Sequence, residues 1–497
     1  MLSMEPLHAL IKAMTKTEKR YFRLTADMQK RKDNKDYLAL FDMLDHEDTY
    51  SHALTKKIQT HFPGKQVEPA RKHLYHVIMK SLRQFEGDKD IDMRLANLLQ
   101  ESKILYQKGL VGASLSLIEK TKNISLAYER FSYFVVAAKQ EILCLIRTQF
   151  AGIDETTLVQ KQEKIREFLE EQTNAAQHAM LYEVLLLRYW KNGVVRSQKE
   201  ITSMNDLILE EYQFISSRRI KSFESRQLHL QFQSVYFLIS GNPEGSLSIF
   251  RDLDNLFEVN RHLWEDNPTH YINFIDEVLH NLRAIEKYNE LNFYFDRLRS
   301  LTPSSHHLSL VIKYVILSHQ LHSACDRHEY PEANCIIGNK SLLEEKEIQQ
   351  LPINLQTNTY LALARTYFGL GQYSTVLKIA NGVLNKLAGS SQSNYSLFII
   401  FNLMHLQVNI LLKNADYLFY AIRSLERKLK LEKKVYGVEQ LMLKIAKACV
   451  SNKPLTGFEQ DLNAVEKNPL ENYFVKILSL KTWVSKISGT RAKNIKK

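Results

Sequence analysis

The chain has 497 residues, of which 67 are lysine or arginine and 55 are aspartate or glutamate, so its formal net charge is +12. Hydrophobic residues make up 44% and aromatic residues 10%, a composition that is typical of a folded protein and excludes a disordered one. Glycine and proline are scarce, with 16 and 10 residues. Sheet-rich folds and nucleotide-binding folds spend glycine on tight turns and phosphate loops, so this scarcity argues against both.

The first 90 residues predict an N-terminal helical bundle. Thr15 and Glu18 have the spacing of a capping box, which would start a helix running through residues 19–24. Three further helices are expected at 35–46, 52–62 and 67–86. The last two have a short connection, as in a helix-turn-helix, and Arg71 and Lys72 are weak candidates for phosphate contact there. We expect this bundle mainly to cap the repeats that follow, because its basic excess is small.

Beyond residue 90 the sequence predicts a repeat. Apolar residues recur at three- and four-residue spacing almost throughout, so the chain is expected to be all-α. Breaks in this pattern recur every 40 to 48 residues, near Gly109, Gly152, Gly193, Gly241, Lys287, His328, Gly371, Asn414 and Pro454. Each interval is expected to hold two helices, which gives about nine helix pairs over 91–470. A final helix and a basic tail are expected over 471–497.

The clearest unit surrounds Gly371. Leu363, Ala364 and Tyr367 precede this turn glycine, and Tyr373, Val376, Ala380 and Val383 follow it. The unit resembles the tetratricopeptide repeat, although the period is longer than that family's length of about 34 residues and the signature tryptophan is missing. The resemblance implies a right-handed solenoid of helical hairpins, in which the first helix of each pair lines a concave groove that holds a protein or peptide.

Equivalent positions on successive first helices of such an array would form two polar rows. The first row contains His280, His322, Arg365 and Asn409, and the second row, two turns earlier, contains Asn273, Asn358 and Asn402. Amide and imidazole groups on a rigid groove suit an extended peptide backbone or a carboxylate, so these seven residues are the predicted partner-binding surface. The alternative is that they are only the solvent side of each helix. Arg365→Glu is expected to abolish partner capture without lowering the melting temperature.

Catalytic and metal-binding patterns are missing from the sequence. It has no GxxxxGK[ST], GxGxxG, HExxH or GxSxG motif. His319, His322, Cys325 and His328 follow one another every three residues, but a helix turns about 300° at each such step, so they fan around it. We therefore expect no metal, no cofactor and no enzyme activity, and we predict a scaffold or adaptor protein.

A nucleic-acid-associated regulator is the alternative function, with the repeats sensing a ligand or partner. Seven basic residues and no acidic one follow Glu471, and Lys493, Lys496 and Lys497 are weak candidates for phosphate contact.

Cellular location is predicted from cysteines and hydropathy. The four cysteines lie far apart, and charges occur within the first twelve residues, so a cytoplasmic protein without a signal peptide is expected. Residues 387–412 carry no charge, but several asparagines interrupt them, so they are expected to form a buried helix instead of a membrane span. The sequence does not indicate the oligomeric state.

Overall fold

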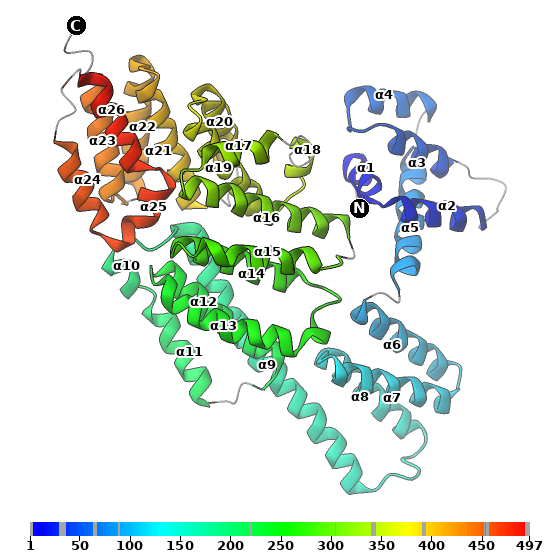
Figure 1. Cartoon of the computed structure of the whole chain (residues 1–497). Helices are drawn as coiled ribbons and strands as arrows, with labels where there is room; N and C mark the ends of the chain where they lie inside the picture. The colour runs from blue at the N-terminus through cyan, green and yellow to red at the C-terminus, as the bar shows by residue number, and fades with distance from the viewer. Residues whose placement is uncertain are drawn as a thin grey trace. The chain divides into compact units, whose positions relative to one another are not determined.

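The computed structural model describes residues 3–28, 36–62, 67–87, 90–217, 221–303, 305–338, 344–389, 394–432, 434–451, 453 and 457–492. The regular elements of these residues are all helices, which confirms the predicted all-α class for this part of the chain (Figure 1). The chain divides into two compact units. The first contains residues 1–170, 265–267 and 303–307, and the second contains 171–264, 268–302 and 308–497.

The first unit begins with five helices that share one core. They are α1 (Met4–Ala13), α2 (Lys16–Met28), α3 (Asp36–His46), α4 (His52–His61) and α5 (Val67–Glu86). The capping box is confirmed, because the amide of Glu18 donates to Oγ1 of Thr15 at 3.2 Å and the amide of Thr15 donates to Glu18 at 2.6 Å. Leu7, Phe22 and Phe41 are fully buried in this core. Helix α1 was not predicted from the sequence.

The rest of the first unit is a run of helices that pack in chain order. They are α6 (Ile91–Gln107), α7 (Val111–Ala127), α8 (Phe131–Arg147) and the first part of α9 (Glu155–Asn192). The rings of Phe131 and Phe168 stack with centroids 4.7 Å apart, which fixes α8 against α9.

The second unit continues α9 and holds all later helices. Those before residue 340 are α10 (Gln198–Thr202), α11 (Asn205–Ser217), α12 (Phe223–Ile239), α13 (Pro243–Val259), α14 (Thr269–Ala284), α15 (Leu291–Ser300), α16 (His306–Asp326) and α17 (Tyr330–Gly338). Those after it are α18 (Glu345–Ile348), α19 (Ile353–Gly369), α20 (Tyr373–Gly389), α21 (Tyr395–Leu411), α22 (Ala415–Glu432), α23 (Gly437–Val450), α24 (Phe458–Glu466), α25 (Asn472–Ile477) and α26 (Leu480–Ala492). Short 3₁₀ turns lie at Arg261–Leu263, Tyr288–Glu290 and Pro469–Glu471.

Six of the predicted breaks are helix ends of one kind. Gly109, Gly241 and Gly371 have φ of 82°, 79° and 76°, and the next amide reaches back five residues, as from Leu110 to the carbonyl of Leu105 at 3.0 Å. This is the Schellman ending, which favours glycine because it needs a left-handed residue. The same i→i−5 bond closes three breaks where a non-glycine residue is left-handed, at Glu286, His328 and Lys413. The expected break at Pro454 lies outside the described residues.

The prediction of two helices in every interval is wrong between Gly152 and Gly193. The 38-residue helix α9 fills that interval without a turn. Helix-forming residues run through it uninterrupted by glycine or proline, and the apolar pattern of one long helix resembles that of two short ones.

Helices α17 and α19 approach closely because of one small residue. A Cβ atom at Gly369 would overlap the ring of Tyr330. Close approach of this kind is the packing role that small residues play in helical-hairpin repeats. Within segment 387–412, residues Tyr395–Leu411 form α21, and nearly all of this helix is buried, as predicted. Residues 387–389 are the end of α20. None of the helices in the described part of the chain combines the length and apolarity needed to cross a bilayer.

Candidate functional site

A charged network in the second unit links the C-terminal ends of α14, α16 and α19. Asp326, the last residue of α16, accepts bonds from two guanidinium groups. Arg283 donates to its Oδ2 at 2.9 and 3.0 Å, and Arg365 donates to its Oδ1 at 2.8 Å. The three side chains are at most 7% exposed. Burial by itself would raise the pKa of Asp326, but the two guanidiniums hold that pKa far below its ordinary value.

His322 extends this network from Arg365 to the neutral side chain of Asn358. Its Nδ1 lies 3.0 Å from Nη1 of Arg365 and its Nε2 lies 3.1 Å from Oδ1 of Asn358. Because a guanidinium only donates, Nδ1 must accept, so the ring carries its proton on Nε2 and donates to Asn358. Burial, together with the charges of Arg283 and Arg365, lowers the pKa of His322 well below its ordinary value. The imidazole is therefore a fixed neutral linker.

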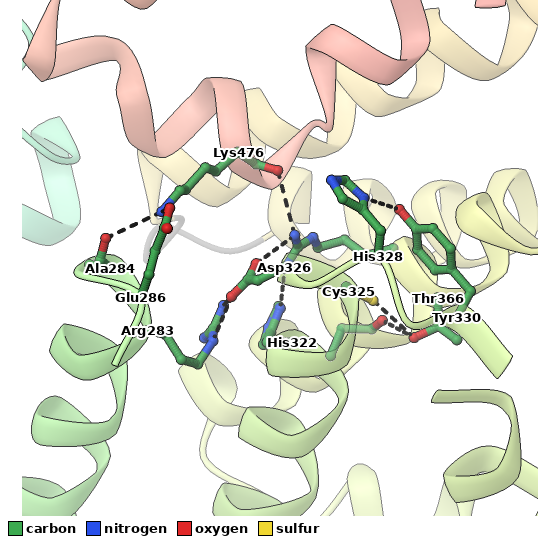
Figure 2. A network of polar contacts seen from close by, with 12 residues as sticks. Arg283, Ala284, Glu286, His322, Cys325, Asp326, His328, Tyr330, Thr366 and Lys476 are labelled. Atoms are coloured by element: carbon green, nitrogen blue, oxygen red, sulfur yellow. Dashed lines mark hydrogen bonds and ion pairs between the residues drawn. The ribbon is translucent and has the colours of Figure 1, made fainter. Parts of the chain in front are cut away.

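The C-terminal helices of the same unit complete the network. The carbonyl oxygen of Lys476, in α25, lies 3.5 Å from Nη2 of Arg365. The Nζ of Lys476 donates to the carbonyl of Ala284 at 3.3 Å and pairs with Glu286 at 2.6 Å (Figure 2). Gln407 of α21 donates to the carbonyl of Leu478 at 2.9 Å. Helices α19 and α21 thus bind main-chain carbonyls where α25 ends.

A second buried ion cluster fixes the same C-terminal segment. Arg196 donates from Nη2 to Glu439 at 2.8 Å and to Glu471 at 2.5 Å. Its guanidinium carbon also lies 4.3 Å from the ring centroid of Tyr436 and 3.8 Å from that of Phe474. Burial raises the pKa of Glu439, and the charge of Arg196 opposes that shift. A charge-assisted bond and a cation–π contact therefore hold Arg196 to Glu471 and Phe474 of the C-terminal segment.

Two carboxylates of α14 lie beside this network. Asp276 is 2.7 Å from Nε2 of His319, and Tyr182 of α9 donates to Glu277 at 3.4 Å. Burial, with the charge of Asp276 next to it, raises the pKa of Glu277 to about 8. Burial beside Arg283 lowers the pKa of His280 to about 4. Glu277 is therefore mainly protonated at pH 7, which removes a charge from the interior.

The first predicted row does not line an open groove. His322, Arg365 and Asn409 are buried, with 1%, 3% and 3% of their surfaces exposed. Their polar atoms bind residues of this chain, and the C-terminal helices lie over Arg365. His280 is half-buried, with its ring centroid 5.9 Å from that of Tyr473. The expectation that Arg365→Glu would leave the melting temperature unchanged is wrong, because the new carboxylate would be buried against Asp326.

The second predicted row remains accessible in part. Asn273 is exposed, whereas Asn358 and Asn402 are half-buried. Asn358 accepts from His322, and Asn402 donates to the carbonyl of Phe398 within its own helix at 2.8 Å. The structure therefore places the two rows differently: the first is internal, and the second lies toward the N-terminal ends of the same helices.

The other predicted sites have simple structural surroundings. Arg71 and Lys72 pair with Glu68 in the same helix, at 2.5 and 3.8 Å. Lys493, Lys496 and Lys497 lie outside the described residues. The Sγ of Cys325 lies 3.4 Å from Oγ1 of Thr366. In the part of the chain that the structure describes, no group of histidine, cysteine or acidic residues is arranged to hold a metal.

Sequence reasoning missed Arg283, Asp326 and Lys476, which carry the network. Arg283 and Asp326 follow His280 and His322 by three and four residues, so they lie one turn further along the same helix faces. Extending the row by one turn would have found them. The sequence gives no such signal for Lys476, because its position depends on the C-terminal segment folding back onto α14 and α19.

In comparisons with known proteins, no family model, curated protein or solved structure matches this chain.

Proposed function

We propose that this protein is a non-catalytic scaffold of the tetratricopeptide-like kind, a helical-hairpin solenoid that holds a protein or peptide segment. One observation supports the proposal: helices α19 and α21 of the second unit hold the end of helix α25 by its main-chain carbonyls. Arg365 and Gln407 face the carbonyls of Lys476 and Leu478, while Glu286 pairs with the lysine side chain. A rigid array that already makes such contacts offers them at low ordering cost.

The proposed partner surface is the second row, because the chain's own C-terminal helices occupy the first. Asn273, Asn358 and Asn402 carry amides that suit a peptide backbone, and they have exposed or half-buried surfaces. The four free cysteines agree with a reducing compartment, and we propose a cytoplasmic protein.

Affinity capture from the native lysate tests this proposal. The wild-type protein, the double variant Asn273→Lys/Asn402→Lys and a matched control, Asn463→Lys on the exposed side of α24, are compared at equal folded concentration. We expect one stoichiometric protein with the wild type and the control, and its loss with the double variant. Equal capture by all three would refute the proposed surface.

Nuclease treatment and salt test the alternative of a nucleic-acid regulator. Capture that collapses after nuclease treatment, or that weakens steeply with ionic strength, would indicate phosphate binding instead. Arg71 and Lys72 would then be the first residues to change. We expect capture to survive nuclease treatment, because contacts to amides depend little on salt.

A further inference from the structure

The second half of α9 has an exposed stripe at the spacing used by paired helices. From Thr173 to Trp190 its exposed positions alternate by three and four residues, so they repeat every seven. Met180, Leu187 and Trp190 are 45%, 48% and 45% exposed. We call this set the α9 stripe, and its members are Thr173, Ala176, Met180, Glu183, Leu187 and Trp190.

The α9 stripe is separate from the side of α9 that packs in the core. Leu181 and Leu185 are fully buried against residues of α11 and α12, including Leu207 and Phe232. A helix on the surface of a protein needs only one apolar face. Large apolar side chains gathered in a second face indicate an interaction site.

The order of side-chain sizes along the stripe indicates its occupant. Within the second unit, which begins at Glu171, the small residues Thr173 and Ala176 lie at one end of the stripe, and the large ones, Leu187 and Trp190, lie at the other. In an antiparallel pair of two α9 helices, Trp190 lies opposite Thr173 of the second copy, and Leu187 lies opposite Ala176. Large side chains then fill the space beside small ones. A parallel pair would place Trp190 against Trp190 and leave a gap at Thr173.

Charges beside the stripe agree with the antiparallel arrangement. Lys191 flanks the end with the large residues, and Glu170, whose side chain is 68% exposed, flanks the opposite end. An antiparallel pair brings Lys191 next to Glu170 of the second copy at both ends. Flanking pairs of this kind set the orientation of paired helices.

We propose that the α9 stripe is a homodimer interface in which two copies of α9 pack antiparallel. The stripe spans 18 residues, about 27 Å of helix. Because each helix is already formed in the monomer, pairing does not incur the cost of helix nucleation. An interface of this size lies at the lower end of specific interfaces, so a dissociation constant in the micromolar range, about 1–50 µM, is expected.

Glu183 gives the proposal a distinctive consequence. In the antiparallel pair it lies near the middle of the interface, opposite Met180 of the second copy and close to the other Glu183. Two carboxylates in this position repel each other and lose hydration. Glu183→Leu is therefore expected to tighten the dimer at least about tenfold.

Sedimentation velocity on the full chain, from about 1 to about 100 µM, tests the proposal. We expect a concentration-dependent monomer–dimer equilibrium that Leu187→Glu abolishes. The matched control Tyr420→Glu changes a side chain that is 71% exposed on α22 and should leave the equilibrium unchanged. A monomer at every concentration, or a dimer that Leu187→Glu does not weaken, would overturn the proposal.

A charge exchange tests the orientation. Lys191→Glu is expected to weaken the dimer, because it places two acids together at each end. Adding Glu170→Lys in the same chain should restore the dimer, since opposite charges then face each other again. Failure of the double variant to recover, when the single variant weakens the dimer, would overturn the antiparallel arrangement.

Discussion

Asp326→Asn is the change that should most affect the second unit. Asp326 lies between the guanidiniums of Arg283 and Arg365 and pairs with both. Asparagine offers one acceptor, so its amide hydrogens must face the other guanidinium, and two buried positive charges remain without a counter-charge. Breaking a buried ion pair in this way costs about 3–5 kcal/mol. Arg365 also faces the carbonyl of Lys476, so α25 should loosen together with the pair.

Urea unfolding and hydrogen exchange measure these two effects. We expect a lower midpoint with an unchanged slope, and faster amide exchange in Asn472–Ile477. Asp461→Asn is the control: Asp461 pairs with Lys444 at 2.5 Å, but their side chains are 40% and 62% exposed, so its loss should cost at most about 1 kcal/mol. If Asp326→Asn costs no more than the control, the network does not stabilise the fold as we describe.

The pH dependence of this difference has a definite sign. The pKa of Asp326 is lower in the folded chain than in the unfolded one. Its contribution is therefore fully present above the unfolded pKa, near 4, and is lost as the pH falls toward the folded value. The gap between wild type and Asp326→Asn should narrow in acid, and a gap that widens below pH 4 would contradict this account.

Two further changes test packing and charge. Glu277→Gln should stabilise the protein by about 1–3 kcal/mol at pH 7, because a folded pKa of about 8 makes folding take up a proton. Urea unfolding should show that this gain in stability disappears near pH 4. A gain that does not change with pH would refute this explanation. Gly369→Ala should lower the melting temperature, because its Cβ overlaps the ring of Tyr330, whereas Gly382→Ala, with open space around it in α20, should add about 0.5–1 kcal/mol. Equal effects of the two alanines would contradict the close approach.

Local signals in the sequence were sufficient for most helix ends. A glycine such as Gly241 marks a left-handed ending because other residues adopt that conformation at a cost. The break at His328 was found without a glycine, since the apolar pattern stopped there. The length of α9 was missed because a turn was assumed where none of the usual turn residues occur. Periodicity reports which face of a helix is apolar, but not whether the helix continues.

The candidate site shows where such reasoning stops. His322 and Arg365 were identified as polar residues at equivalent positions of two helices. The carbonyl that faces Arg365, however, belongs to Lys476, which is 111 residues further along the chain. Spacing along one helix identifies a face but not what covers it. These side chains are internal because the C-terminal segment packs over them.

The packing of the C-terminal segment also sets an order for biosynthesis. Arg196 and its partner Glu471 are separated by 275 positions, so the ribosome makes the arginine long before the glutamate. In most helical arrays each hairpin completes its contacts as soon as the next one emerges. In this chain Arg196 and Arg365 lack part of their hydrogen-bond partners until α25 leaves the exit tunnel. We therefore expect chaperones and proteases to bind a nascent chain that stops shortly before Pro469, although nearly every helix of the unit has then been translated.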